Sequence, residues 1–317
     1  MSDSEQGART EAAADRLRID AATVEVMRAF ADGGIRCLLL KGPALASWYA
    51  DDLTRSYLDC DLWVRPRDLD SAAPILERLG FERHLDDRAM PAWWLDHATI
   101  WLRVTDGVVV DVHRALQGLG VDADTAWTIL TATIEILTVA GAPVPTLAVP
   151  ARALYVTLHA AHHGRGGGKA ITHLERALSA EDDSVWRRAS ELAEELQATD
   201  PFGSGLRLTS AGASLAKRLG LPATQSVKVA LHAASPPPIA LGFEQLASAP
   251  GWRARAGIVR HKLFPPPAFI RHWAPRAAEN RGQLALAYMR RPFWVLRRAP
   301  RGLKAWLDAR RRVRRGH

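Results

Sequence analysis

The spacing of apolar and polar residues in the first half of the chain predicts alternating helices and strands. A helix is expected from Ala21 to Gly33, with Asp20 as its N-cap and Gly33-Gly34 as its stop. A run of β-forming residues at 35–40 predicts the first strand. Beyond it the pattern predicts a strand at 58–64, an amphipathic helix at 68–79, a hairpin of 98–104 with 108–113, and a strand pair of 134–139 with 144–149.

The periodicity becomes helical after Pro150, where Leu154, Leu158 and Ala161 fall on one face. More helices are expected around Leu174 and over 186–196. The glycine-rich run 164–169 lacks the spacing of a P-loop and is expected to be a flexible connection. The pattern therefore predicts an α+β fold, in which a mixed sheet with flanking helices precedes a mostly helical second domain.

Two proline runs, 236–238 and 265–267, predict that the last third consists of short helices joined by stiff turns. No internal repeat is evident. We therefore expect four segments: a disordered tail at 1–20, a mixed α and β domain at 21–149, a helical domain at 150–289 and a basic tail at 290–317.

The composition is that of an ordinary globular chain, with 48% hydrophobic and 24% charged residues among 317. The polar N-terminal segment carries no signal-peptide pattern, and no apolar run reaches the length of about 18 residues that a membrane helix needs. A cytoplasmic location is expected. Cys37 and Cys60 lie in predicted strands and lack zinc spacing, so we interpret them as buried, reduced thiols.

The net charge of +8 is concentrated at the C-terminus, because residues 290–317 hold 11 Arg or Lys and one acid. The rest of the chain holds 31 basic and 33 acidic side chains. In the basic tail Leu303, Trp306, Leu307 and Val313 fall near helical spacing. Three roles remain open for this helix: binding to an anionic membrane surface, binding to nucleic acid, or packing on the helical domain.

Two carboxylates interrupt the predicted strand 58–64. Asp59 and Asp61 point to one face of that strand, since successive side chains alternate. Two unit charges about 5 Å apart repel by about 3 kcal/mol at an effective dielectric near 20, which favours a compensating cation such as Mg²⁺ or Mn²⁺. Asp111, with His113 on its own face, is a third acid on the predicted hairpin. The alternative is a solvated strand face.

Phosphate binding is predicted where the first strand ends, at Lys41-Gly42. Backbone N–H groups at such a junction can hold an anion, and the lysine adds a positive charge. Arg55, four residues before Asp59, either neutralises phosphate or braces the strand through an ion pair. The alternative for Gly42 is that it only makes the turn.

These motifs together resemble the uncharacterised bacterial nucleotidyltransferases of the polymerase-β superfamily. The resemblance rests on Lys41-Gly42, on Arg55, on Asp59-Cys60-Asp61 followed by Leu62-Trp63-Val64, and on Val110-Asp111-Val112-His113. A helical segment with His159, His162 and His163 extends it. It covers roughly residues 15 to 200 and departs from many members in the longer spacing from Gly42 to Asp59.

The resemblance implies a nucleotidyltransferase-type sheet and Mg-dependent transfer of a nucleoside monophosphate from an NTP, expected to be ATP, to an acceptor hydroxyl. It implies that Asp59, Asp61 and Asp111 are catalytic metal ligands, and that Lys41, Gly42 and Arg55 bind the nucleotide. The acceptor is expected to be a biosynthetic small molecule or a peptide. The alternatives are a toxin- or antitoxin-like enzyme acting on RNA, and a non-catalytic nucleotide-binding module.

Two histidine groups have open roles. His113 is expected to support the site and not to bind the ligand directly. His159, His162 and His163 fall at i, i+3 and i+4 on one side of a helix. They would form either a metal or phosphate site, or a polar face between domains.

Overall fold

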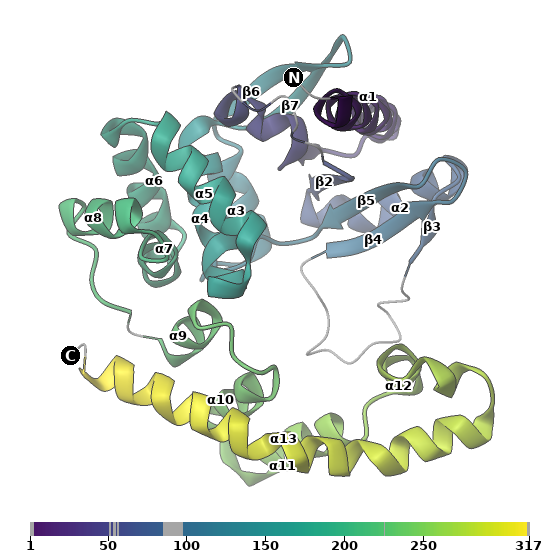
Figure 1. Ribbon diagram of the computed structural model, residues 1–317, viewed down its shortest axis with the longest axis vertical. Coiled ribbons are helices and arrows are strands. Elements are labelled where there is room, and N and C mark those ends of the chain that lie inside the picture. Colours follow the sequence, from purple (N-terminus) through teal and green to yellow (C-terminus); the bar gives the residue numbers. More distant parts are fainter. Residues whose placement is uncertain are drawn as a thin grey trace. The chain divides into compact units, whose positions relative to one another are not determined.

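The computed structural model describes residues 3–50, 52, 55, 57–84, 98–224 and 226–315 (Figure 1). The described residues form two compact units. The first comprises residues up to 84 with 98–159 and 169–202, and the second comprises 160–168 with 203–315. This division differs from the predicted boundary after residue 149. The assignment of 21–149 as a separate catalytic domain remains a prediction.

A mixed sheet of seven strands organises the first unit, and it confirms the predicted α+β fold. The strand order is β3-β4-β5-β2-β1-β7-β6. β2 pairs in parallel with β5, and β1 in parallel with β7, whereas the other neighbours are antiparallel. The strands are β1 (Cys37–Leu39), β2 (Asp59–Val64), β3 (Glu82–Arg83), β4 (Ala98–Arg103), β5 (Val108–His113), β6 (Ile134–Val139) and β7 (Ala142–Leu147).

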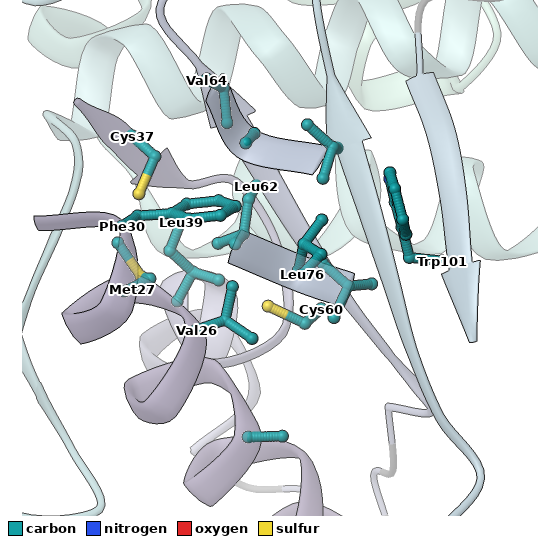
Figure 2. Close-up of a cluster of buried hydrophobic side chains, with 14 of the residues drawn as sticks. Val26, Met27, Phe30, Cys37, Leu39, Cys60, Leu62, Val64, Leu76 and Trp101 are labelled. Carbon is teal, nitrogen blue, oxygen red and sulfur yellow. The ribbon is translucent and has the colours of Figure 1, made fainter. Parts of the chain in front are cut away.

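One face of this sheet is apolar because alternate residues of its central strands are apolar. Cys60, Leu62 and Val64 of β2 belong to the same buried cluster as Val108, Val110 and Val112 of β5. Figure 2 shows Val26, Met27 and Phe30 of the first helix pointing into this cluster. The period of two that buries Leu62 also directs Asp59 and Asp61 to the opposite face.

The first helix, α1 (Asp3–Asp32), corrects the prediction of a disordered tail at 1–20. The helix extends toward the N-terminus because its apolar face continues there: Ile19 is fully buried and Ala12 nearly so. Asp20 is not an N-cap. Its carboxylate accepts a hydrogen bond of 2.5 Å from the Tyr57 hydroxyl.

The predicted helices at 68–79, after Pro150, around Leu174 and over 186–196 are confirmed, whereas α3 and α7 were not predicted. α2 and α3 follow strands, and Asp122 and Asp182 cap α3 and α6 by accepting backbone N–H bonds. α4 and α7 each continue from the first unit into the second. The helices are η1 (Gly42–Tyr49), η2 (Pro66–Asp68), α2 (Leu69–Arg78), α3 (Ala123–Leu130), α4 (Val149–His163), α5 (Gly168–Ala180), α6 (Asp183–Glu195) and α7 (Thr199–Leu206).

The second unit is helical, and in it α9 and α10 lie against the long α13 (Figure 1). Short helices were expected, but α13 continues through Pro292 and Pro300. Each proline removes one backbone donor and crowds the carbonyl four residues before it, so both positions cost stability in a helix that nevertheless continues past them. The elements are η4 (Gly164–Gly166), α8 (Ser210–Arg218), α9 (Val227–Ala233), α10 (Ile239–Ser248), α11 (Gly251–Leu263), α12 (Pro267–Trp273), η5 (Pro275–Ala278) and α13 (Arg281–Arg315).

Two expectations about composition can be compared with this fold. Cys37 and Cys60 are both free and buried, as predicted, and burial raises the pKa of the Cys37 thiol to about 12. None of the described helices combines the length and the apolar content that crossing a membrane requires.

Candidate functional site

The predicted acids meet because β2 and β5 are parallel neighbours. Asp61 pairs in register with Asp111, and Asp59 pairs with Val109 (the strands are labelled in Figure 1). Paired residues of neighbouring strands present their side chains on the same face of the sheet. The register therefore brings together two carboxylates that are 50 residues apart in the chain.

A ligand cluster forms on this face from Asp61, Asp111 and His113. One donor atom from each of the three lies within 4.8 Å of the others. Within the described part of the chain, no other group of His, Cys, Asp or Glu side chains comes together in this way. Asp61 and His113 are almost completely buried, and Asp111 is half-buried. The two carboxylates are oxygen ligands of the kind that Mg²⁺ and Mn²⁺ prefer, and an imidazole beside them is a ligand that other divalent transition metals also accept.

One oxygen of the Asp61 carboxylate contacts two side chains. Lys41 Nζ donates to Oδ1 at 2.7 Å, and His113 Nε2 lies 2.9 Å from the same oxygen. Burial by itself would raise the pKa of Asp61. His113 and Lys41 lower this pKa by more than burial raises it, so the carboxyl group is ionised. Its second oxygen, Oδ2, is buried and finds no hydrogen-bond partner among the described residues. An ionised, buried oxygen without a donor fits a bound cation.

Asp59 lies outside this cluster, although it shares the face of Asp61. Its side chain is 35% exposed, and its Oδ1 is 4.0 Å from Lys169 Nζ on α5. Two residues along a strand span about 6.6 Å, which separates Asp59 from the Asp61–Asp111 pair. The structure therefore joins two of the three predicted acids and adds His113, which we had expected only to support them.

Lys41 and Gly42 lie where β1 gives way to η1, as predicted. Burial lowers the pKa of Lys41, but Tyr155 and Asp61 raise it more, so the ammonium stays charged. Its Nζ lies 6.0 Å from the centroid of the Tyr155 ring. Gly42 has a φ of +60°, which favours glycine at this turn. Its contact with phosphate remains a prediction.

Arg55 makes no ion pair with Asp59 in the described part of the chain. Its guanidinium donates to the Gly42 carbonyl at 2.9 Å and lies 4.1 Å from the Tyr49 ring centroid. Arg55 thus braces the turn after β1. Tyr49 in turn hydrogen-bonds to His173 Nδ1 on α5. Burial and the nearby Arg55 lower the pKa of His173 to about 3, so its ring is neutral.

Two residues near the acids were not found from the sequence. Tyr155 comes from α4 and Lys169 from α5, and both approach the predicted site residues. A weak signal existed for each. Tyr155 precedes His159 by one helical turn and stacks on it, with ring centroids 6.0 Å apart. Lys169 ends the glycine-rich run that we had interpreted only as a connection.

The three histidines of α4 do not form a metal group among the described residues. His162 stacks on His232 of α9 with ring centroids 4.5 Å apart, and it lies edge-on to His163. These contacts give His162 a packing role in the second unit. The alternative of a polar face between domains stays a prediction.

The chain was compared with curated proteins and with solved structures. No curated protein matches the chain. Among solved structures, the chain is similar to the antibiotic-resistance factor ANT(2″)-Ia, with 15% identity, a TM-score of 0.39, and coverage of 58% of this chain and 95% of that one. It is also similar to an antigenic nucleotidyltransferase-like protein from Paracoccidioides brasiliensis, with 12% identity, a TM-score of 0.33, and coverage of 58% and 92%. Similarity at this level adds nothing to the assignment.

The family model described as "Uncharacterised nucleotidyltransferase" matches residues 4–212. The match includes every strand of the sheet and all the residues of the acid cluster. Because it spans about two thirds of the 317 residues, the chain belongs to this nucleotidyltransferase family.

Proposed function

We propose that the chain transfers a nucleoside monophosphate from an NTP to an acceptor hydroxyl, with a divalent cation at Asp61 and Asp111. The observation that carries this proposal is the buried Asp61 Oδ2, which has no donor within the described chain, in a carboxylate that clusters with its register partner Asp111. Asp59 would widen the site toward the triphosphate, since it shares the face of Asp61 and is accessible. Mg²⁺ is the expected ion and ATP the expected nucleotide.

The reaction needs three things from these residues. The acceptor oxygen forms a bond to the α-phosphorus as the bond to the bridging oxygen breaks and pyrophosphate leaves. The Asp111 carboxylate can accept the proton of the acceptor hydroxyl. Lys41, which stays charged, can neutralise a phosphate oxygen. The cation, when bound, supplies positive charge beside the phosphate oxygens.

The decisive test is label transfer from [α-³²P]ATP with Mg²⁺ and fractionated cell extract, in wild type and in Asp111→Asn. Loss of the carboxylate should reduce transfer by at least about 100-fold, the usual contribution of a general base. Asp70→Asn is the matched control, because Asp70 is exposed on α2 and lies outside the cluster. Equal transfer by wild type and Asp111→Asn would overturn the assignment.

The same assay separates the alternatives. Label in an RNA fraction would favour an enzyme that acts on RNA, and label in a small molecule or peptide would favour a biosynthetic role. If the protein binds ATP with Mg²⁺ but no fraction gains label, it is a non-catalytic nucleotide-binding module.

We propose in addition that α13 binds an anionic membrane surface. Its exposed apolar residues follow helical spacing, and we call them the α13 stripe: Met289, Phe293, Leu296, Leu303 and Leu307. Phe293 is 74% exposed. Trp306 and Val313, which were predicted to share this face, instead pack inward, and Trp306 donates to Glu244 at 2.7 Å. One face of α13 is thus buried by packing, whereas the α13 stripe stays exposed.

Charge favours lipid as the occupant of the stripe. Arg297, Arg298 and Arg301 line a hollow of about 690 Å³ together with Phe293 and Trp294. A second copy of this chain that docked through the same face would bring like charges against these arginines, whereas acidic lipid headgroups complement them. An apolar stripe flanked by arginines is typical of helices that lie in a membrane interface.

Vesicle co-sedimentation tests this second proposal. Phe293→Ser/Leu296→Ser should weaken binding to phosphatidylserine-containing vesicles by at least about tenfold, since each buried apolar side chain contributes about 1.5–3 kcal/mol. Leu17→Ser, at an exposed leucine of α1, is the control. Undiminished binding by the double variant would reject the stripe, and binding to RNA but not to vesicles would favour nucleic acid.

A further inference from the structure

Three arginines converge on one pocket of the second unit. Arg165 comes from η4, Arg207 follows α7, and Arg312 comes from α13. The pocket has a volume of about 250 Å³, and the hydroxyl residues Ser204 and Thr224 also line it. Segments about 40 and 100 residues apart in the chain thus supply charge and hydroxyl groups to one small space.

Arg207 is fixed in place and incompletely bonded. Its Nη2 donates to the Leu221 carbonyl at 2.7 Å. Its Nη1 is buried and has no hydrogen-bond partner among the described residues. Gly203 makes room for this nitrogen, since a Cβ there would lie 2.8 Å from it. A buried charged donor without an acceptor is unfavourable, and an acceptor from a ligand would remove that cost.

The part of the pocket wall that the structure describes offers no compensating negative charge. None of the described residues that line the pocket is acidic, and the remaining walls are alanine, leucine and valine side chains. Three arginines line this pocket, and like charges that lie near one another repel unless an anion lies between them. Arginine forms paired hydrogen bonds with phosphate oxygens, so a phosphate group is the best complement to this arrangement.

Arg165 is held in position by the glycine-rich run that we had expected to be a flexible connection. Gly164 has a φ of +61°, and a Cβ on it would lie 2.1 Å from the His232 carbonyl oxygen. The Gly166 N–H donates to Ser235 Oγ at 2.7 Å, and Ser235 in turn donates to the His163 carbonyl. Close packing on α9 therefore requires glycine here and fixes the backbone beside Arg165.

From these contacts we infer that the pocket formed by Arg165, Arg207 and Arg312 binds a small phosphate-bearing molecule. The volume accommodates a phosphate group with a body of a few carbon atoms, and the apolar walls suit such a body. The inference does not depend on the proposed transfer reaction. The phosphate could be inorganic or carried by a phosphomonoester, and the two sources are distinguished by experiment.

Calorimetric titration of the full chain with inorganic phosphate and with glycerol 3-phosphate tests the site. The measurement is made in EDTA, so that no cation recruits phosphate to the acid cluster. Arg312→Gln and Arg165→Gln should each weaken the Kd by about tenfold or more, the effect expected for one charged hydrogen bond. Tighter binding of glycerol 3-phosphate than of phosphate would identify a phosphomonoester, and the reverse order would identify the free anion.

Arg311→Gln is the control, because Arg311 precedes Arg312 on α13 but pairs with Asp308 at 3.4 Å. The Kd of this variant for phosphate should differ from that of wild type by less than about twofold, as expected for an exposed charge outside the pocket. Arg207→Lys retains the charge but removes the second guanidinium nitrogen, and should also weaken binding. If Arg207→Lys does not fold, the two exposed positions still decide the question. Absence of binding at millimolar phosphate, or equal weakening by Arg311→Gln, would overturn the inference.

Discussion

The acid cluster of the first unit and the arginine pocket of the second contain charge of opposite sign. Asp61 has a lysine and a histidine on one oxygen and nothing within the described chain on the other. The arginine pocket has three positive groups and no acid among its described lining. In the two proposals above, each ligand supplies the charge that its site lacks: a cation for the carboxylates and an anion for the guanidinium groups. Predictions can challenge this contrast from either side.

The largest effect is expected from Lys41→Met, which removes the cation from the buried pair with Asp61. Breaking a buried ion pair at one partner costs about 3–5 kcal/mol, because the remaining charge stays buried. Urea unfolding should show this loss. Lys217→Met, at an exposed lysine of α8, should change the free energy of unfolding by less than about 0.5 kcal/mol.

A second substitution sharpens this result. In Lys41→Met/Asp61→Asn both charges are absent, so part of the lost stability should return. If the double variant is less stable than Lys41→Met alone, the Lys41–Asp61 pair is not the source of the effect.

The next largest effect is expected in the pH dependence of the free energy of unfolding, and it comes from His173. Burial is the largest cause that lowers the pKa of His173 to about 3, followed by the charges of Arg55 and Lys169. In the folded protein the imidazole therefore stays neutral at a pH where the same group in the unfolded chain, with its ordinary pKa, is already protonated. The contribution of His173 to the free energy of unfolding is complete above about pH 6.5 and is lost as the pH falls toward 3. The loss between pH 7.5 and pH 4.5 is about 2–3 kcal/mol. His173→Asn should lack this component. Parallel pH dependences of the two proteins would contradict it.

Cation binding gives a smaller stabilisation. Mg²⁺ or Mn²⁺ at ten times its Kd should stabilise the fold by about 1.4 kcal/mol, since it binds only the folded cluster. Thermal unfolding should show the shift in wild type and in Asp70→Asn, but not in Asp111→Asn. An equal shift in all three proteins would indicate a cation site elsewhere.

The smallest effect concerns the arginine pocket without ligand. Arg312→Gln removes one of three like charges and should raise the free energy of unfolding by up to about 0.5 kcal/mol, the range for an exposed charge. Added phosphate should remove or reverse this advantage in chemical denaturation, because the wild type then gains the bound anion. A variant that is less stable than wild type without phosphate would contradict the repulsion.

Local periodicity predicted every strand of the sheet except β3 and placed Asp59 and Asp61 on one face, because alternation along a strand determines which face a side chain occupies. It did not give the pairing of Asp61 with Asp111. It could not distinguish Asp59 from His113 as the third member, since that depends on the register between β2 and β5. Long-range packing also determined the helical N-terminus. The arginine pocket joins residues that no local pattern connects, so the sequence could not reveal it.

The parallel register of β2 with β5 also bears on folding specificity. Asp59 and Asp61 alternate with core residues in β2, and Asp111 lies between two core valines in β5. A slip of one residue would therefore turn Asp61 or Asp111 toward the cluster that contains Val26, Phe30 and Leu76. A carboxylate buried among these side chains would have no donor, which disfavours the slipped sheet strongly. The residues assigned here to chemistry thus also select the correct strand alignment. A protein that lost both acids would gain stability in misaligned sheets that the present sequence excludes.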